Sequence, residues 1–273
     1  MGKYRNAFSL DGRVAVVTGG AGILGSECVT ALADAGANVA VVDVNLDAAS
    51  ALAERIAVEF GVATLGVACD VSDEASVLDM VREVESTLGP IDVLHNNAAS
   101  KSSSLEHFFE PLETFSLETW REVMSVNLDG LFLVARSIGT GMAERGRGSI
   151  IQTASIYGAT MGPDQRIYEG SEYLGRAINT PPVYSASKGG VHALTLYLAT
   201  YWGKNNVRVN TLTPGGITSG QNGIFNDKYS ARVPMARMAE AHEVASGMLF
   251  LASDLSTYVS GQNLHVDGGL SAW

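Results

Sequence analysis

Short apolar runs alternate with longer amphipathic stretches along almost the whole chain of 273 residues. The runs that read as strands are 14–18, 39–43, 66–69, 93–96, 149–153, 207–211 and 263–266. The stretches with helical periodicity are 24–36, 47–60, 73–88, 117–145, 184–204 and 240–253. Strands separated by helices of this length form βαβ units, in which helices cover both faces of a parallel sheet. The sequence therefore predicts an α/β fold with one doubly wound parallel sheet of about seven strands.

A glycine-rich turn, TGGAGILG, follows the first predicted strand and opens the first predicted helix. Glycines let the backbone approach a pyrophosphate, and a helix N-terminus favours its negative charge. Asp43 ends the next strand, 18 residues after Gly25, near the offset of about 20 for a carboxylate that binds the adenosine ribose. That carboxylate would repel a 2′-phosphate, so the sequence favours NAD over NADP. The alternative is that Asp43 only caps a helix.

Tyr184 and Lys188 stand four residues apart in the string VYSASKGG, within a predicted helix. Residues at this spacing share one helix face, so the lysine charge should lie close to the phenol. A nearby cation favours the phenolate and lowers a pKa that is ordinarily about 10. Such a tyrosine can act as a general acid or base. Alone, the pair would also fit an ordinary amphipathic helix, and its weight comes from the dinucleotide turn upstream.

Charge and composition limit the possible partners. The net charge of −11 argues against nucleic acid and against an anionic membrane surface. No apolar run reaches the ~18 residues of a membrane span, and the first ten residues lack the apolar core of a signal peptide. Cys28 and Cys69 are far apart and form no CxxC motif, and the five histidines show no metal spacing. We expect a cytoplasmic protein that binds a small molecule and no metal.

From about Leu10 to its end, the chain resembles the short-chain dehydrogenase/reductase family. The matching pieces are TGGAGILG, CDV at 69–71, NNAA at 96–99, VN at 126–127, the serine in TASIYG, YSASK, PGGITS at 214–219 and VDGG at 266–269. The resemblance implies a single Rossmann-type domain over 1–273, with 10–150 mainly binding the dinucleotide and 151–273 carrying catalysis and substrate binding. It also implies NAD(P)-dependent oxidoreduction and a homodimer or homotetramer.

The glycine turn departs from the family pattern TGxxxGxG at one position. Gly19 and Gly25 match its first and last glycines, but Ile23 occupies the middle one. A β-branched residue does not adopt a left-handed backbone. We therefore expect φ below zero at Ile23, or a slight shift of the loop.

The family's site residues are carried over where the motifs match. Asp70 and Val71 should flank the adenine, Asn97 and Ala98 should line the adenosine ribose and pack against the turn, and PGGITS should surround the nicotinamide unless it is a plain Pro-Gly turn. The cofactor residues implied are Gly19, Ile23, Leu24, Gly25, Asp43, Asp70, Val71, Asn97, Ala98, Tyr184, Lys188, Pro214, Gly215, Ile217 and Ser219.

The same resemblance assigns four catalytic roles. Tyr184 is the general acid and base, and Lys188 lowers its pKa and holds the nicotinamide ribose. Ser155 orients the substrate oxygen, and Asn127 holds a proton-relay water near the lysine. The alternatives are a strand-end cap for Ser155 and a kink inside a helix for Asn127.

The segment between Ser155 and Tyr184 is longer than is common in the family, which implies an insert within residues 158–182. It leaves beside the catalytic serine and returns at the catalytic tyrosine, so it should border the substrate pocket unless it is a surface decoration or a subunit contact. The substrate candidates are Ser155 and Tyr157 beside it, and Arg166, Tyr168, Tyr173, Arg176 and Asn179 within it. Lys101 and His107, on the loop 100–115, either meet an acidic group or are simply solvated.

The insert, YLGRAINTP and the ending VDGGLSAW also resemble, more narrowly, short-chain dehydrogenases of flagellin-modification and nonulosonic-acid sugar pathways. This suggests a sugar or sugar-derived substrate with several hydroxyls. We therefore expect an NAD-dependent secondary alcohol dehydrogenase or ketone reductase for a polar small molecule. There are two alternative functions. One is a 3-oxoacyl- or steroid-type reductase, whose substrates require an apolar pocket. The other is a catalytically silent NAD-binding regulator.

The helix predicted from Tyr184 carries more apolar residues than one sheet face needs, although core packing could account for much of this. These residues are Val191, Leu194, Leu198, Tyr201 and Trp202. In the family this helix pairs with its copy across a two-fold axis, which is why we expect a homodimer or homotetramer.

Overall fold

The computed structural model describes residues 2–173 and 175–273 and shows one parallel sheet of seven strands. The strands are β1 (Val14–Thr18), β2 (Asn38–Asp43), β3 (Thr64–Ala68), β4 (Ile91–Asn96), β5 (Gly148–Thr153), β8 (Val207–Pro214) and β9 (Asn263–Val266). Their order across the sheet is β3-β2-β1-β4-β5-β8-β9, and every neighbouring pair is parallel. This confirms the predicted doubly wound α/β domain.

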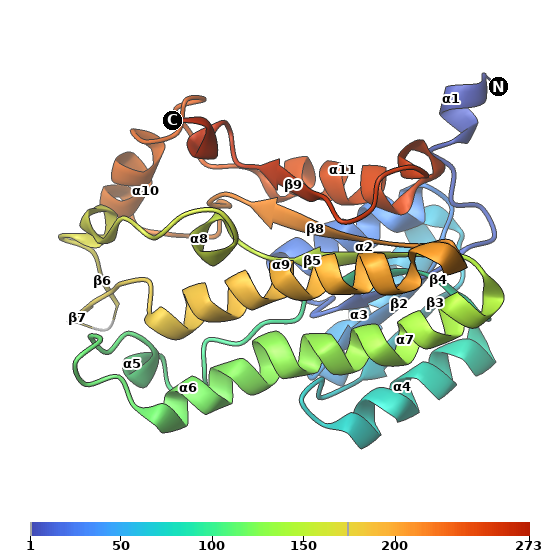
Figure 1. The fold of residues 1–273 in the computed structure, drawn as a ribbon, viewed down its shortest axis with the longest axis horizontal. Coiled ribbons are helices and arrows are strands. Elements are labelled where there is room, and N and C mark those ends of the chain that lie inside the picture. The colour runs from blue at the N-terminus through green and yellow to red at the C-terminus, as the bar shows by residue number, and fades with distance from the viewer. Residues whose placement is uncertain (1, 174) are drawn as a thin grey trace.

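Helices cover both faces of the sheet (Figure 1). One layer contains α4 (Glu74–Thr87), α7 (Leu131–Arg145) and α9 (Pro182–Trp202), and the other contains α2 (Ile23–Asp34), α3 (Leu46–Phe60) and α11 (Ala241–Ala252). The stretch expected as one helix over 117–145 forms α6 (Leu117–Met124), a π-helical turn over Ser125–Gly130 and then α7. A π turn widens the helix locally and is frequent at functional sites.

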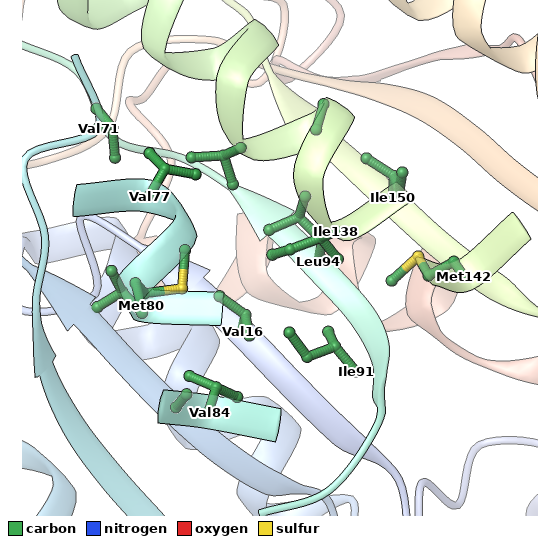
Figure 2. Close-up of a cluster of buried hydrophobic side chains, with 14 of the residues drawn as sticks. Val16, Val71, Val77, Met80, Val84, Ile91, Leu94, Ile138, Met142 and Ile150 are labelled. Carbon is green, nitrogen blue, oxygen red and sulfur yellow. The ribbon is translucent and has the colours of Figure 1, made fainter. Parts of the chain in front are cut away.

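Strand β1 shows why its sequence is apolar at nearly every position. Successive side chains point to opposite faces of a sheet, and both faces are covered here. Val14 and Val16 pack toward α4 and α7, in the cluster that Figure 2 shows. Ala15 and Val17 pack toward α2 and α11. Each fully buried valine or leucine contributes about 1.5–3 kcal/mol, so the sheet is the main source of stability.

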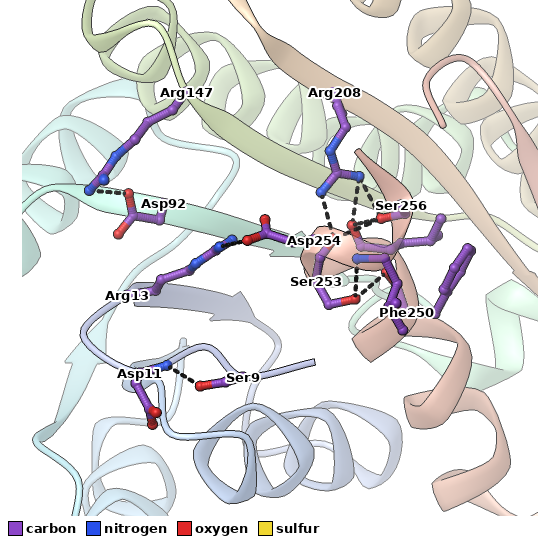
Figure 3. A network of polar contacts seen from close by, with 12 residues as sticks. Ser9, Asp11, Arg13, Asp92, Arg147, Arg208, Phe250, Ser253, Asp254 and Ser256 are labelled. Atoms are coloured by element: carbon purple, nitrogen blue, oxygen red, sulfur yellow. Dashed lines mark hydrogen bonds and ion pairs between the residues drawn. The ribbon is translucent and has the colours of Figure 1, made fainter. Parts of the chain in front are cut away.

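Polar contacts tie the amino ends of the strands to the end of α11 (Figure 3). Arg13, just before β1, pairs with Asp254 at 2.6 Å. Arg208, in β8, donates to the Leu251 carbonyl at 2.9 Å and to Ser256 Oγ at 2.8 Å. Burial lowers the pKa of the Arg208 guanidinium to about 10. These contacts cover the amino ends of the strands, so the carboxyl ends remain open for binding.

Short elements gather at the carboxyl end of the strands, the end to which β8 and β9 point in Figure 1. They are α5 (Leu105–Phe108), α8 (Ile156–Ala159), α10 (Gly223–Ser230) and the hairpin of β6 (Glu172–Tyr173) and β7 (Arg176–Ala177); α1 (Lys3–Asn6) lies apart from them, at the N-terminal end. In the described part of the chain, none of the helices combines the length and the apolar character that crossing a membrane requires.

Candidate active site

The glycine turn between β1 and α2 has no room for side chains at two of its glycines. Gly19 has φ +61°, and a Cβ there would lie 3.0 Å from the Ala98 Cα. A Cβ on Gly25 would lie 2.1 Å from the Gly19 carbonyl oxygen. No side chain caps the first turn of α2, so its N–H groups can bind a phosphate. The turn therefore fits a dinucleotide.

Ile23 is accommodated without strain. It is the first helical residue of α2, so its φ is negative as expected, and its side chain is exposed. The glycine missing from the family pattern is thus not needed for a left-handed backbone in this chain.

Asp43, at the end of β2, lies against the glycine turn. Its Oδ2 accepts the Ala21 N–H at 3.2 Å, and its Oδ1 accepts the Asn45 N–H at 3.1 Å. The N-cap of α3 is Asn45, whose side chain accepts the Ala48 N–H. Asp43 is therefore not the helix cap, and its carboxylate is placed beside the turn that would hold the cofactor.

The strand order reverses between β1 and β4, which is where ligands bind in open α/β sheets. Thr18 joins the two strands here, a role that the sequence did not indicate. Its Oγ1 accepts the N–H groups of Asn97 at 2.9 Å and Ala98 at 3.1 Å. Asn97 Nδ2 donates in turn to the Thr18 carbonyl at 3.2 Å. The predicted ribose residues are thereby fixed to the glycine turn.

The predicted adenine residues lie after β3. Asp70 accepts the Ser72 N–H at 2.9 Å, and Val71 is buried against Gly130, where a Cβ would lie 2.8 Å from the valine Cγ2. This contact connects the predicted adenine side of the site to the π turn that carries Asn127.

Ser155 and Tyr184 meet where β5 ends and α9 begins. Ser155 caps α8 by accepting the Tyr157 N–H at 3.2 Å, so the structural alternative also holds for it. It also hydrogen-bonds Tyr184, which favours the phenolate. Burial outweighs this bond and raises the pKa of Tyr184 above its usual value. A hydroxyl and a phenol so placed can hold one substrate oxygen between them.

Lys188 was predicted to lower the pKa of Tyr184, but the net shift of that pKa is upward because the phenol is buried. The Nζ of Lys188 donates to the Thr153 carbonyl at 3.0 Å, and the dominant effect on the tyrosine is burial. Burial likewise lowers the pKa of Lys188 to about 8. The buried ammonium is therefore still mostly protonated at neutral pH, on the same cavity wall as Ser155 and Tyr184.

Asn127 lies in the π turn, where the sequence left a helix kink as the alternative, and it is buried. Its Oδ1 accepts the Ser100 N–H at 2.7 Å, and its Nδ2 donates to Ser187 Oγ at 3.5 Å. The side chain thus joins the loop after β4 to α9, one residue before Lys188.

A cavity of about 750 Å³ opens above these groups. The predicted site residues on its wall are Leu24, Asn97, Ser155, Tyr157, Tyr184, Lys188, Pro214, Gly215, Ile217 and Ser219. The remaining predicted cofactor residues lie off this wall, around the glycine turn and β3. The cavity therefore covers the catalytic end of the predicted dinucleotide site.

The insert borders the cavity, but not through its arginines. Tyr168 and Asn179 line the wall, as does Lys101 from the loop after β4. Arg166 is exposed and bound to Asp164, and Arg176 pairs with Glu106. The structure therefore places neither arginine on the cavity wall, because acidic neighbours bind both guanidiniums outside it.

His107 is likewise off the wall and lies 3.1 Å from Glu110. The side chain of Tyr173 lies outside what the structure describes.

Several wall residues were missed by the sequence reasoning. They are Phe108, Phe109, Glu172, Ile178, Thr180, Gln221, Asn222, Phe225, Tyr229 and Met238. Only their place next to the motifs could have identified them. They lie on the polar loop after NNAA, on the insert, and on the segment after PGGITS.

Comparison with known proteins agrees with this geometry. The family model described as enoyl-(acyl carrier protein) reductase matches residues 19–271. D-threitol dehydrogenase of Mycolicibacterium smegmatis is 36% identical over 267 residues, which are 96% of this chain and 94% of that protein. Galactitol 2-dehydrogenase (L-tagatose-forming) of Cereibacter sphaeroides is 34% identical over 277 residues, 99% of each chain.

A solved gluconate 5-dehydrogenase of Burkholderia cenocepacia, in complex with NADP and tartrate, superposes with a TM-score of 0.85 at 33% identity over 98% of both chains. These matches and the Ser155–Tyr184–Lys188 group agree on NAD(P)-dependent oxidoreduction between a hydroxyl and a carbonyl group. The chain belongs to the short-chain dehydrogenase/reductase family.

Proposed function

We propose that the protein oxidises a secondary hydroxyl of a small neutral polyol with NAD as the preferred hydride acceptor, and reduces the ketone in reverse. The observation that carries this is the Ser155–Tyr184 pair at the base of a cavity whose polar wall groups are mostly hydroxyls and amides. The intact Ser155, Tyr184 and Lys188 on one cavity wall also argue against the silent regulator.

Each catalytic side chain has a separate task. When bound, the nicotinamide accepts or returns the hydride. Ser155 holds the substrate oxygen by its hydroxyl, and the Tyr184 phenol oxygen takes the hydroxyl proton during oxidation and returns it during reduction. Lys188 keeps a positive charge near the phenol and would hold the ribose hydroxyls. Asn127 fixes the turn beside them and would position a relay water.

The character of the cavity supports a neutral polyol. Among the described wall residues, the charged ones are Lys101, Glu172 and Lys188. The first two are exposed, and the third serves catalysis, so a carboxylate finds no buried guanidinium. Hydroxyl and amide groups, by contrast, bind substrate hydroxyls by neutral hydrogen bonds. Burial raises the pKa of the Tyr157 phenol, which keeps it a neutral donor on the wall.

The acyl and steroid alternatives are less well supported. Phe108, Phe109 and Phe225 do give the wall apolar patches, which suit the C–H faces of a polyol as well as an acyl chain. A long apolar substrate would have to pass the insert, whose wall residues include Glu172, Asn179 and Thr180. Burying polar groups against an alkyl chain leaves them unpaired, at about 1–3 kcal/mol each.

The preference for NAD rests on Asp43. Its carboxylate lies 3.2 Å from the Ala21 nitrogen in the glycine turn, where a 2′-phosphate would bring a second negative charge. A solved relative of the same family contains NADP, so we attribute the preference for NAD in this chain to the Asp43 side chain rather than to the fold.

The proposed assembly is a homodimer, or a homotetramer built from such dimers. Val191, Leu198 and Trp202, which we expected at an interface, belong to the core. The outer face of α7 and α9 still exposes Phe132, Tyr197 and Tyr201, beside a groove of about 340 Å³. A second copy of the chain, related by a two-fold axis, is our proposed occupant. Two unbridged cysteines support the cytoplasm as its location.

A substrate panel tests the proposed reaction. Purified protein is assayed for reduced cofactor with D-threitol, galactitol and gluconate, and for ketone reduction with acetoacetyl-CoA. We expect oxidation of at least one neutral polyol, at a higher kcat/KM than gluconate, because the wall offers a carboxylate no buried cation besides Lys188, which serves catalysis. Reduction of acetoacetyl-CoA without oxidation of either polyol would contradict the proposal and favour the acyl reductase.

A further inference from the structure

Two segments far apart in the sequence build the far wall of the cavity together. The insert (158–182) contributes Tyr168 and Asn179, and the segment 219–235, which contains α10 and is called the lid segment below, contributes Asn222 and Phe225. Figure 1 shows α10 beside the insert, at the carboxyl end of the sheet. The lid segment follows the nicotinamide loop PGGITS, so its position decides the shape of the substrate space.

Asp164 of the insert binds two arginines with one carboxylate. Arg166 donates from Nε to Oδ1 and from Nη2 to Oδ2, both at 2.8 Å. The Nη1 of Arg232, in the lid segment, pairs with the same Oδ2. The Asp164 side chain is only 15% exposed, and removing one partner of a shielded ion pair costs more than removing one partner of an exposed pair. Of the two, only the Arg232 pair joins the insert to the lid segment.

Lys228, on α10, reaches into the backbone of the insert. Its Nζ donates to the carbonyls of Arg166 at 3.2 Å and Glu169 at 2.7 Å. At the other end of α10, the Oγ of buried Ser171 donates to Asn222 Oδ1 at 3.2 Å. Asn222 also caps α10 by accepting the Phe225 N–H. The insert thus holds α10 near both of its ends.

A small apolar core lies under these polar contacts. The Tyr168 ring stacks on Phe225 with centroids 5.4 Å apart, and Phe225 contacts Tyr229 at 5.7 Å. Ile167 of the insert is buried in the same cluster as Val233 of the lid segment. This cluster is separate from the two that cover the sheet. An isolated helix of eight residues is marginal in water, so α10 depends on this packing.

We propose that Asp164 is a positioning residue: through Arg232 it holds the lid segment on the insert, so that the substrate wall is formed before the substrate binds. A preformed wall saves the substrate the entropy of ordering the lid segment. Releasing the lid segment should therefore weaken substrate binding more than it slows the chemical step, because Ser155 and Tyr184 stand on other elements.

Hydrogen exchange of the full-length protein with NAD alone tests the positioning role, because it needs no substrate. The variants are Asp164→Asn and Arg232→Met, and the matched control is Arg166→Met, which removes an arginine from the same carboxylate without cutting the link. We expect amides of 222–235 to exchange about tenfold faster in the first two variants, the factor for one charge-assisted hydrogen bond. Amides of β1 and α4, and all amides of the control, should match the wild type.

A kinetic arm, with D-threitol as the probe, rests on the proposed function. We expect Asp164→Asn and Arg232→Met to raise KM with a smaller change in kcat, and Arg232→Lys, which keeps the charge, to restore most of the wild-type KM. Failure to turn over D-threitol at all would count against the proposed substrate, and the exchange arm would then decide alone.

Unchanged exchange of 222–235 in both link variants would overturn the positioning role. So would an equal effect of Arg166→Met, or a uniform rise in exchange over the whole chain, since either would make Asp164 a general stabilising residue.

Discussion

Lys188 serves the proposed reaction through its charge, but burying that charge lowers the stability of the fold. Burial lowers the pKa of Lys188 from 10.5 to about 8, so the folded state resists protonation more than the unfolded chain does. The cost of burying the charge is fully present below pH 8. It fades as the pH rises from 8 to 10.5, because the unfolded chain then loses its proton as well.

We therefore predict that Lys188→Met abolishes activity and stabilises the fold at pH 7. The pKa shift corresponds to about 3 kcal/mol, from which about 1 kcal/mol is lost with the Thr153 hydrogen bond. The wild type should approach the variant as the pH rises to 10. Urea unfolding at both pH values checks this, and a variant less stable than the wild type at pH 7 would refute it.

A second prediction concerns Asp43 and the choice between NAD and NADP. Asp43→Ser removes the charge beside the Ala21 N–H while keeping a hydrogen-bonding side chain, so repulsion of a 2′-phosphate falls. We expect the ratio of kcat/KM for NAD over that for NADP to shrink in the variant. Kinetics measured in parallel with both cofactors would show the smaller preference. A wild type that already prefers NADP would contradict the proposed role of Asp43.

The positions of single residues were predicted well where a motif on a regular element fixes them, and poorly where neighbours in space decide. Ser155, Tyr184 and Lys188 are fixed by motif spacing on regular elements, and the structure brings them together on one cavity. Arg166 and Arg176 were expected at the substrate but pair with Asp164 and Glu106, because the partner of a long cationic side chain depends on which carboxylate lies near it in space. The direction of the Tyr184 pKa shift failed likewise, since burial cannot be read from a YxxxK string.

At the scale of elements, the packing of α7 against α9 offers a matched pair of glycines. A Cβ at Gly139 would lie 2.3 Å from the Trp202 ring, whereas at Gly141 the nearest atom is the flexible end of Arg145 at 3.0 Å. We predict that Gly139→Ala destabilises the protein by about 1–3 kcal/mol through overpacking. Gly141→Ala should stabilise it by up to about 1 kcal/mol through helix propensity.

Thermal or urea unfolding of the two variants separates these effects. If both alanines stabilised the protein, α7 and α9 would be packed less closely than the structure shows.

Elements with regular periodicity were predicted nearly to their ends, as β1 and β9 show. The π turn inside the expected helix 117–145 was not predicted, because six residues are too few to show a period different from that of the surrounding helix. Helix α10 and the hairpin of β6 and β7 were missed as well. They are too short for a periodic pattern, and contacts between the insert and the lid segment hold them in place.

In the whole molecule, structural contacts and the cavity lie at opposite ends of one sheet. The amino end is closed by ion pairs such as Arg13–Asp254, and the carboxyl end carries the glycine turn and the cavity lined by Ser155, Tyr184 and Lys188. The motifs that the sequence singled out follow strands, and this is why they lie at the carboxyl end. The sequence could not predict the wall of the cavity, which depends on how the insert and the lid segment pack on each other.

Assembly is the prediction that belongs to this scale. Exposed Phe132, Tyr197 and Tyr201 on α7 and α9 would be buried by a second copy, and burying aromatic side chains is a strong contribution to interfaces. We expect light scattering to give a dimer or tetramer at micromolar concentration, and Tyr197→Glu with Tyr201→Glu to shift it toward the monomer. A wild-type monomer would contradict the proposal.

The central claim is that Tyr184 moves the substrate proton while Ser155 holds the oxygen. Burial raises the pKa of the phenol, so it is largely protonated at neutral pH. Oxidation, which needs the phenolate, should therefore speed up as the pH rises, whereas reduction, which needs the phenol, should slow down.

The most direct test is the pH profile of kcat for polyol oxidation in the wild type and in Tyr184→Phe, with cofactor binding measured alongside. We predict that the variant binds NAD nearly as the wild type does, loses a factor of roughly 10²–10⁴ in kcat, and no longer shows the alkaline rise. A variant that retains near wild-type turnover with the same pH dependence would show that another group moves the proton.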